Sequence, residues 1–96
     1  MIGSNLYCLY DRVAEEAGPL FHAVNDGVAL RQTVQTLKPL PPTIREEYSL
    51  FRVGSYDART MKIDVCVPQE IDITISLMRS MDYDTQQPAE VRINEQ

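Results

Sequence analysis

The chain has 96 residues, of which 44% are apolar and 24% are charged. These proportions are typical of one small globular domain, and they exclude a disordered chain or two ordinary domains. No apolar run reaches the roughly 18 residues that a membrane-spanning helix needs. The amino-terminal segment lacks a basic stretch followed by an apolar run, so we expect no secretory signal.

Charge is unevenly distributed along the sequence. Nine Lys and Arg residues against 14 Asp and Glu residues give a formal net charge of −5. The segment from Asn25 to Lys62 holds six cations and four acids, a balance of +2, whereas Ile63 to Gln96 holds two cations and seven acids, a balance of −5. An acidic total argues against a nonspecific polyanion binder but leaves room for a local basic face.

The first predicted element is a strand over residues 5–10, because apolar and aromatic residues fill both of its alternating sets. Residues 13–18 are expected to form a helical turn, which Gly18 and the following proline end. The apolar run over residues 20–24 then leads into the next element.

A helix is predicted from an Asn25 N-cap to Lys38. Asparagine accepts a backbone N–H at the N-cap, and Leu30, Val34 and Leu37 share one face of the helix. Prolines at positions 39, 41 and 42 end it.

A β-hairpin is predicted next. Residues 47–56 form its first strand, residues 57–60 the turn, and residues 61–67 the second strand, in which apolar residues alternate with mostly polar ones. Pro68 is expected to end that strand. Residues 69–81 fit a strand pattern and also a helical stripe, and their β-branched content favours a strand.

These elements predict an α+β domain over residues 1–81, in which a small, mostly antiparallel sheet of β-α-β-β order with a fourth strand packs on one main helix. Residues 82–96 hold few apolar residues and are expected to form a flexible acidic tail. The predicted core consists of Leu6, Cys8, Leu30, Val34, Leu37, Phe51, Val53, Ile63 and Val65.

The sequence contains no recognisable catalytic or metal-binding constellation. His22 is the single histidine, and no nucleophile elbow, zinc motif or phosphate-binding glycine loop occurs. We therefore expect a protein that is not an enzyme and that uses no cofactor or metal. Cys8 and Cys66 are expected to be buried, reduced thiols of a cytoplasmic protein, with a disulfide as the alternative.

Aromatic and basic residues alternate along the predicted strands, a pattern that fits stacking on unpaired bases and pairing with phosphates. Strict alternation places Arg52 and Tyr56 on one side of their strand and Phe51 on the other. The alternative is that the aromatic residues simply fill the core. The candidate nucleic-acid-binding residues are Arg31, Lys38, Arg52, Tyr56, Arg59 and Lys62.

Four segments, taken in order, resemble the small non-structural protein of gokushovirus-type microviruses, which are phages with circular single-stranded DNA. These segments are Leu9–Arg12, Pro19–Phe21, Asn25–Arg31 and Glu47–Asp57. The resemblance covers residues 6–68. It implies a protein that is absent from the virion, is made in the cytoplasm of the infected bacterium and acts in viral genome replication.

Two main functions follow from these observations. The first is non-catalytic binding of single-stranded DNA or of a DNA replication complex. The second is a protein-interaction module that regulates a viral replication initiator or a host replication protein without touching nucleic acid; a mimic of DNA built on the acidic tail is a third. Open sheet edges also predict a homodimer.

Overall fold

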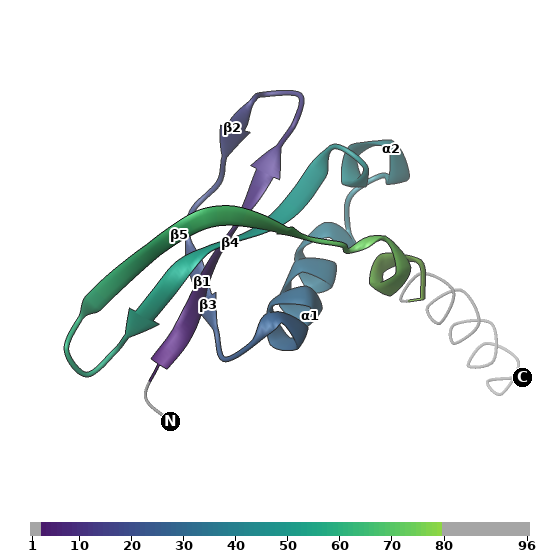
Figure 1. The fold of residues 1–96 in the computed structure, drawn as a ribbon. Coiled ribbons are helices and arrows are strands. Elements are labelled where there is room, and N and C mark those ends of the chain that lie inside the picture. The colour runs from purple at the N-terminus through teal and green to yellow at the C-terminus, as the bar shows by residue number, and fades with distance from the viewer. Residues whose placement is uncertain (1–2, 80–96) are drawn as a thin grey trace, which may run out of the picture.

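One antiparallel sheet and the helices beside it make up residues 3–79, the part of the chain that a computed structural model describes (Figure 1). The elements are β1 (Gly3–Asp11), β2 (Glu16–Ala17), β3 (Phe21–Ala23), α1 (Asp26–Leu37), α2 (Pro42–Arg45), β4 (Tyr48–Asp57) and β5 (Lys62–Ile71). A further helical segment covers residues 74–79. The strand order is β2-β1-β4-β5, and β3 pairs with β1. This confirms the predicted α+β class.

Helix α1 begins and ends where its sequence predicts. The side chain of Asn25 accepts the backbone N–H of Val28 at 2.9 Å, which satisfies one of the donors left free in the first turn. Asp26 places a carboxylate at the positive end of the helix dipole. Val34 and Leu37 of this helix are buried, as expected.

The register of the sheet defines two faces. The helix face carries Tyr7 and Leu9 of β1 beside Arg52 and Leu50 of β4, and the main core cluster joins Tyr7 and Leu50 to Ala29 and Leu37 of α1. The open face is the other side of the same strands. Its residues, read from the same pairings, are Ser4, Leu6, Cys8, Tyr10, Ser49, Phe51, Gly54, Tyr56, Ile63, Val65 and Glu70.

A polar network on the helix face ties α1 to the sheet. The hydroxyl of Tyr7, whose side chain is fully buried, donates to the Asp26 carboxylate at 2.7 Å and accepts from the Asn5 amide at 3.1 Å. The Arg52 guanidinium lies 3.6 Å from the same carboxylate and also donates to the Gln69 side chain of β5. Three strands and the start of α1 therefore meet in one set of contacts.

A β-bulge at Val53 changes which side chains share a face. β1 pairs Leu6 with Gly54 but Tyr7 with Arg52, so Val53 is an extra residue on β4. One inserted residue moves every later side chain to the other face. Arg52 consequently lies on the helix face and Tyr56 on the open face, and the prediction that they share a side is wrong.

The second half of the hairpin also differs from the prediction. β5 continues through Pro68 to Ile71. It accommodates the proline because Pro68 lies in an edge strand, where the pairing with β4 is irregular between Arg52 and Gly54. Residues 74–79 are helical and not a strand, and Leu77 of that helix packs on the core. The helical stripe outweighs the β-branched content there.

The remaining predictions are partly confirmed. Residues 12–15 form a turn and Glu16–Ala17 a short strand, so the helical turn over 13–18 is wrong. Leu6 and Cys8 are buried as expected, but Ile63 and Val65 are 55% and 86% exposed because the edge strand has no layer over it. The acidic tail predicted for residues 82–96 lies outside the described residues.

Replacing Tyr7 with Phe should lower the free energy of unfolding by about 1 kcal/mol, since Asp26 loses a partly buried hydrogen bond. Burial and the hydrogen bond to Asp26 raise the pKa of Tyr7 in the folded state. This contribution is therefore complete below the unfolded pKa of about 10 and is lost as the pH rises further. Denaturant melts of both proteins at pH 7 and above pH 10 should show the difference shrinking.

Tyr10→Phe is the matched control, because the Tyr10 hydroxyl makes no hydrogen bond with another described residue. It should change the free energy of unfolding by only a few tenths of a kcal/mol. Equal losses in the two variants would show that the Tyr7 hydroxyl does not anchor α1.

Gly54→Ala should destabilise the fold by about 1–3 kcal/mol. The added Cβ would overlap the carbonyl oxygen of Asp64 on β5, which is backbone and cannot swing aside. Gly27→Ala is the control, because its Cβ meets only the Asn25 side chain at 3.4 Å and alanine favours a helix. Thermal melts should show opposite shifts in Tm, and a Gly54→Ala protein as stable as the original would contradict the close approach.

Candidate nucleic-acid interface

Two pairs of aromatic rings lie on the open face. Tyr10 and Phe51 meet edge to face, with ring centroids 6.2 Å apart, and His22 and Tyr56 are tilted, with centroids 6.1 Å apart. The register of β1 with β4 places Tyr10, Phe51 and Tyr56 on this face. His22 shares the face because it pairs with Leu6 of β1.

These rings flank Leu6 and Cys8, which are 9% and 7% exposed. The rings thus have a structural role, since they shield two apolar side chains on a face that lacks its own helix in the core cluster. Burial raises the pKa of the Cys8 thiol, which keeps it protonated. The three tyrosine and phenylalanine rings are half-buried and His22 is exposed, so part of each ring remains available to a ligand.

The tip of the β4–β5 hairpin carries two of the predicted cations, Arg59 and Lys62. Both are exposed. Asp57 shapes the turn: its side chain accepts the backbone N–H of Arg59 at 2.9 Å, and its carbonyl accepts that of Met61 at 2.7 Å. Because Asp57 pairs with Lys62 and Tyr56 with Ile63, the Lys62 side chain lies on the opposite side of the hairpin from Tyr56.

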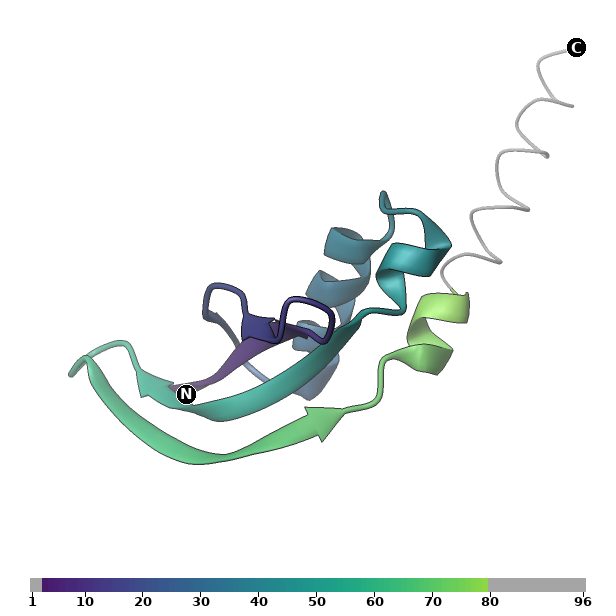
Figure 2. The same ribbon diagram turned by 90° about the horizontal axis from the view of Figure 1, so that it is seen from above.

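The other three predicted cations lie elsewhere. Arg52 is on the helix face, where it contacts Asp26 and Gln69. Arg31 is exposed on α1, and Lys38 is the C-cap of that helix, with its carbonyl accepting from Arg45 at 3.0 Å. The hairpin tip extends away from α1 in both ribbon views (Figures 1 and 2).

The six predicted residues therefore form no single patch. Tyr56 and Arg59 are near neighbours at the hairpin, and the Lys62 side chain lies on the other side of it. Arg52 is paired with an acid, and Arg31 and Lys38 belong to α1. Sequence reasoning missed His22 as a partner of Tyr56. A three-residue strand such as β3 has no detectable alternation, so nothing in the sequence places His22 beside the sheet.

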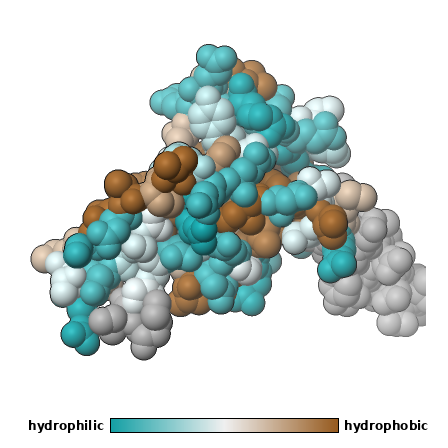
Figure 3. All heavy atoms as spheres, in the orientation of Figure 1, coloured by the Kyte–Doolittle hydropathy of each residue, from teal (hydrophilic) through white to brown (hydrophobic). Residues whose placement is uncertain are grey.

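Exposed apolar side chains lie along β5, and Figure 3 shows hydrophobic residues in brown along this part of the hairpin. Ile63, Val65 and Val67 are 55%, 86% and 80% exposed, and Met61 in the turn is 75% exposed. Such a row on a small domain is a common mark of an interaction surface.

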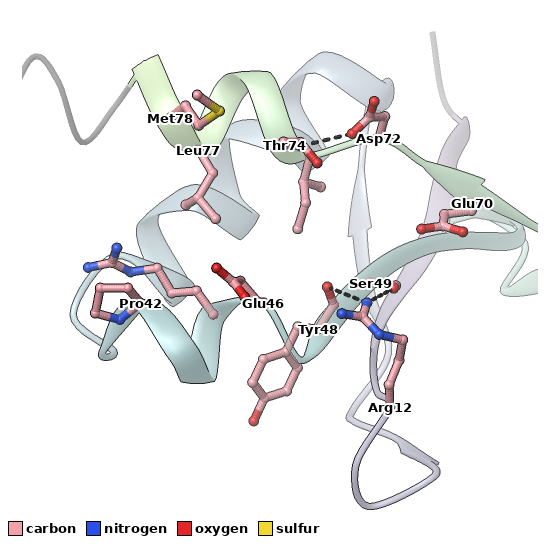
Figure 4. A pocket seen from close by; sticks show the side chains of 12 residues that line it. Arg12, Pro42, Glu46, Tyr48, Ser49, Glu70, Asp72, Thr74, Leu77 and Met78 are labelled. Carbon is pink, nitrogen blue, oxygen red and sulfur yellow. Dashed lines mark hydrogen bonds between the residues drawn. The ribbon is translucent and has the colours of Figure 1, made fainter.

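A pocket of about 350 Å³ lies at the far end of the sheet, between α2, the 74–79 helix and the start of β4 (Figure 4). Arg12 is held there by the Ser49 hydroxyl at 2.5 Å and the Tyr48 carbonyl at 3.2 Å. The lining also carries Arg45 and the three carboxylates of Glu46, Glu70 and Asp72. A backbone hydrogen bond from Thr74 lowers the pKa of Asp72. Acids outnumber cations in the lining, so the pocket is no cradle for phosphate.

Both cysteines are free thiols, but only Cys8 is buried; Cys66 is exposed on β5, so its predicted burial is wrong. Among residues 3–79, no cluster of three or more His, Cys, Asp and Glu side chains could hold a metal ion. Within the same range, no helix has the length and apolar character needed to cross a membrane.

One known protein family matches the chain over most of its length. The model of the phage ORF5 protein family covers residues 4–77, which includes every strand from β1 to β5 and helix α1. No curated protein and no solved structure matches the chain. The chain therefore belongs to the phage ORF5 protein family.

Proposed function

We propose that this phage protein is a non-catalytic, non-structural protein that binds single-stranded DNA, or a replication complex containing it, in the cytoplasm of the infected bacterium. The proposal extends the resemblance to gokushovirus-type microviruses, whose circular genomes pass through a single-stranded form. The observation that carries it is the set of partly exposed rings on the open face, His22 with Tyr56 and Tyr10 with Phe51.

Unpaired bases stack on exposed aromatic rings, and each such contact contributes about 1–3 kcal/mol with little dependence on sequence. Tyr56 and His22 offer such a platform next to the hairpin. Arg59 is exposed there to bind one phosphate, and Lys62 is exposed to bind another phosphate where the DNA leaves the open face. Arg52 contributes little in this arrangement because Asp26 already engages it. Stacking, and not charge, then supplies most of the affinity.

Fluorescence anisotropy with a labelled single-stranded oligonucleotide tests this arrangement. Tyr56→Leu keeps an apolar cover over Leu6 but removes the aromatic face, and should weaken binding roughly 5-fold or more. Tyr56→Phe keeps the ring and should bind like the original protein. Equal affinities for all three proteins, or no binding at micromolar protein in low salt, would rule out stacking on Tyr56.

The salt dependence of the same assay counts the phosphate contacts. Two contacts, from Arg59 and Lys62, predict a slope of about −1.4 in a plot of log affinity against log salt, since each single-strand contact contributes roughly 0.7. Arg59→Ala should reduce the magnitude of the slope by about 0.7. Arg31→Ala on α1 is the matched control and should leave the slope unchanged; a reduction in Arg31→Ala instead would place the DNA on the helix side.

A second candidate function is that of a protein-interaction module that binds the viral replication initiator or a host replication protein. The exposed apolar row on β5 and the dispersal of the cations favour it. Retention of the purified initiator by the immobilised protein, together with an absence of oligonucleotide binding, would select this candidate over the first.

A further inference from the structure

The outer edge of β5 ends the sheet in the described part of the chain. β5 is last in the strand order, and all but one of its ten residues are exposed. An uncapped edge offers a row of backbone N–H and C=O groups to another strand.

Only the first half of β5 is regular enough to pair with another strand. Residues 62–65 pair one to one with residues 54–57 of β4, which in turn pair with β1, so this end is a regular part of the sheet. Residues 66–68 are irregular, because Arg52 pairs with Gln69 while Gly54 pairs with Val65. Pro68 also removes a backbone donor. Bulges and prolines protect edges from pairing, so the usable edge is Lys62–Val65.

The charges on this short edge select one way in which it could pair with itself. In an antiparallel pair of identical strands centred on Ile63, Lys62 of each copy lies opposite Asp64 of the other. Moving the centre to Asp64 would place two carboxylates opposite each other, and moving it to Lys62 would oppose two ammonium groups. Like charges directly opposite are destabilising, and opposite charges are stabilising.

Both residues are free to make such pairs. Lys62 and Asp64 are exposed, and neither side chain has a hydrogen bond or ion pair with another described residue. In the register centred on Ile63, Lys62 would lie between Asp57 of its own β4 and Asp64 of the second copy.

The same register matches the apolar side chains. Ile63, 55% exposed, would lie opposite Ile63 of the second copy, and Val65, 86% exposed, would face the second copy's hairpin turn, which carries Met61, 75% exposed. Because Ile63 pairs with Tyr56 on β4, the open faces of both copies would become one continuous surface. The Ile63 side chains of the two copies thus cover each other, and Val65 gains an apolar neighbour in the turn.

We propose that this protein forms a two-fold symmetric homodimer in which residues 62–64 of two copies pair as antiparallel strands, centred on Ile63. The short contact makes a weak dimer that depends on protein concentration, since stable interfaces usually bury more than about 1,200 Å². This dimer does not depend on DNA binding, because only the edge of β5, its charges and its exposed apolar residues hold it together.

Sedimentation equilibrium over a range of protein concentrations, without DNA, tests the register by a charge swap. Lys62→Asp and Asp64→Lys should each weaken the dimer roughly tenfold, because each turns two attractive pairs into two repulsive ones. The double variant carrying both changes restores opposite charges and should regain the affinity of the original. An original protein that is monomeric at every concentration, or a dimer that both single variants leave unchanged, would overturn the proposal.

Covalent capture provides a second measurement that does not rely on affinity. In a Cys66→Ser background, Ile63→Cys places a thiol at the two-fold axis and should give a disulfide-linked dimer under a mild oxidant. Val67→Cys in the same background is the matched control: Val67 is more exposed than Ile63, but its two copies would lie about 26 Å apart, eight residues along paired strands. Linkage through Val67→Cys and not through Ile63→Cys would disprove this register.

Discussion

The carboxylate of Asp26 is the contact on which the arrangement of helix and sheet depends. It lies in the first turn of α1, accepts the buried hydroxyl of Tyr7 and faces the guanidinium of Arg52. A buried tyrosine needs a partner for its hydroxyl, and a carboxylate near a helix N-terminus is stabilised by the dipole. One side chain thus ties the start of α1 to β1 and also engages Arg52 on the helix face.

This contact also explains why the cations fail to gather. Arg52 is the most central of the predicted binding residues, but Asp26 and Gln69 occupy its guanidinium. Of the exposed cations, Arg59 and Lys62 lie at the hairpin and Arg31 lies on α1, so they belong to different parts of the molecule. The open face is instead distinguished by its rings, so a ligand that this face selects must gain more from stacking or apolar contact than from charge.

The sequence predicts elements that have a strong local pattern. It does not predict features that depend on how one strand pairs with another. The N-cap at Asn25 and the turn at Asp57 use side-chain contacts within three residues, so both are predictable. The bulge at Val53 is different: no local signal marks it, since it exists only relative to the register of β1. The continuation of β5 through Pro68 likewise depends on the irregular pairing opposite it. For this reason the alternation in the sequence puts Arg52 and Tyr56 on one side of β4, whereas the structure puts them on opposite sides.

The bulge and the irregular stretch of β5 lie side by side, and together they give the sheet two distinct ends. Beyond Gly54, toward the hairpin tip, the pairing is regular and the face carries Tyr56 and Ile63. On the other side, the register is shifted so that Ile71 turns toward the core and leads into the 74–79 helix. A strand that was regular throughout would either bury Ile63 and Val65 or expose Ile71. The irregularity allows one strand to complete the core at one end and to leave an apolar edge free for another molecule at the other.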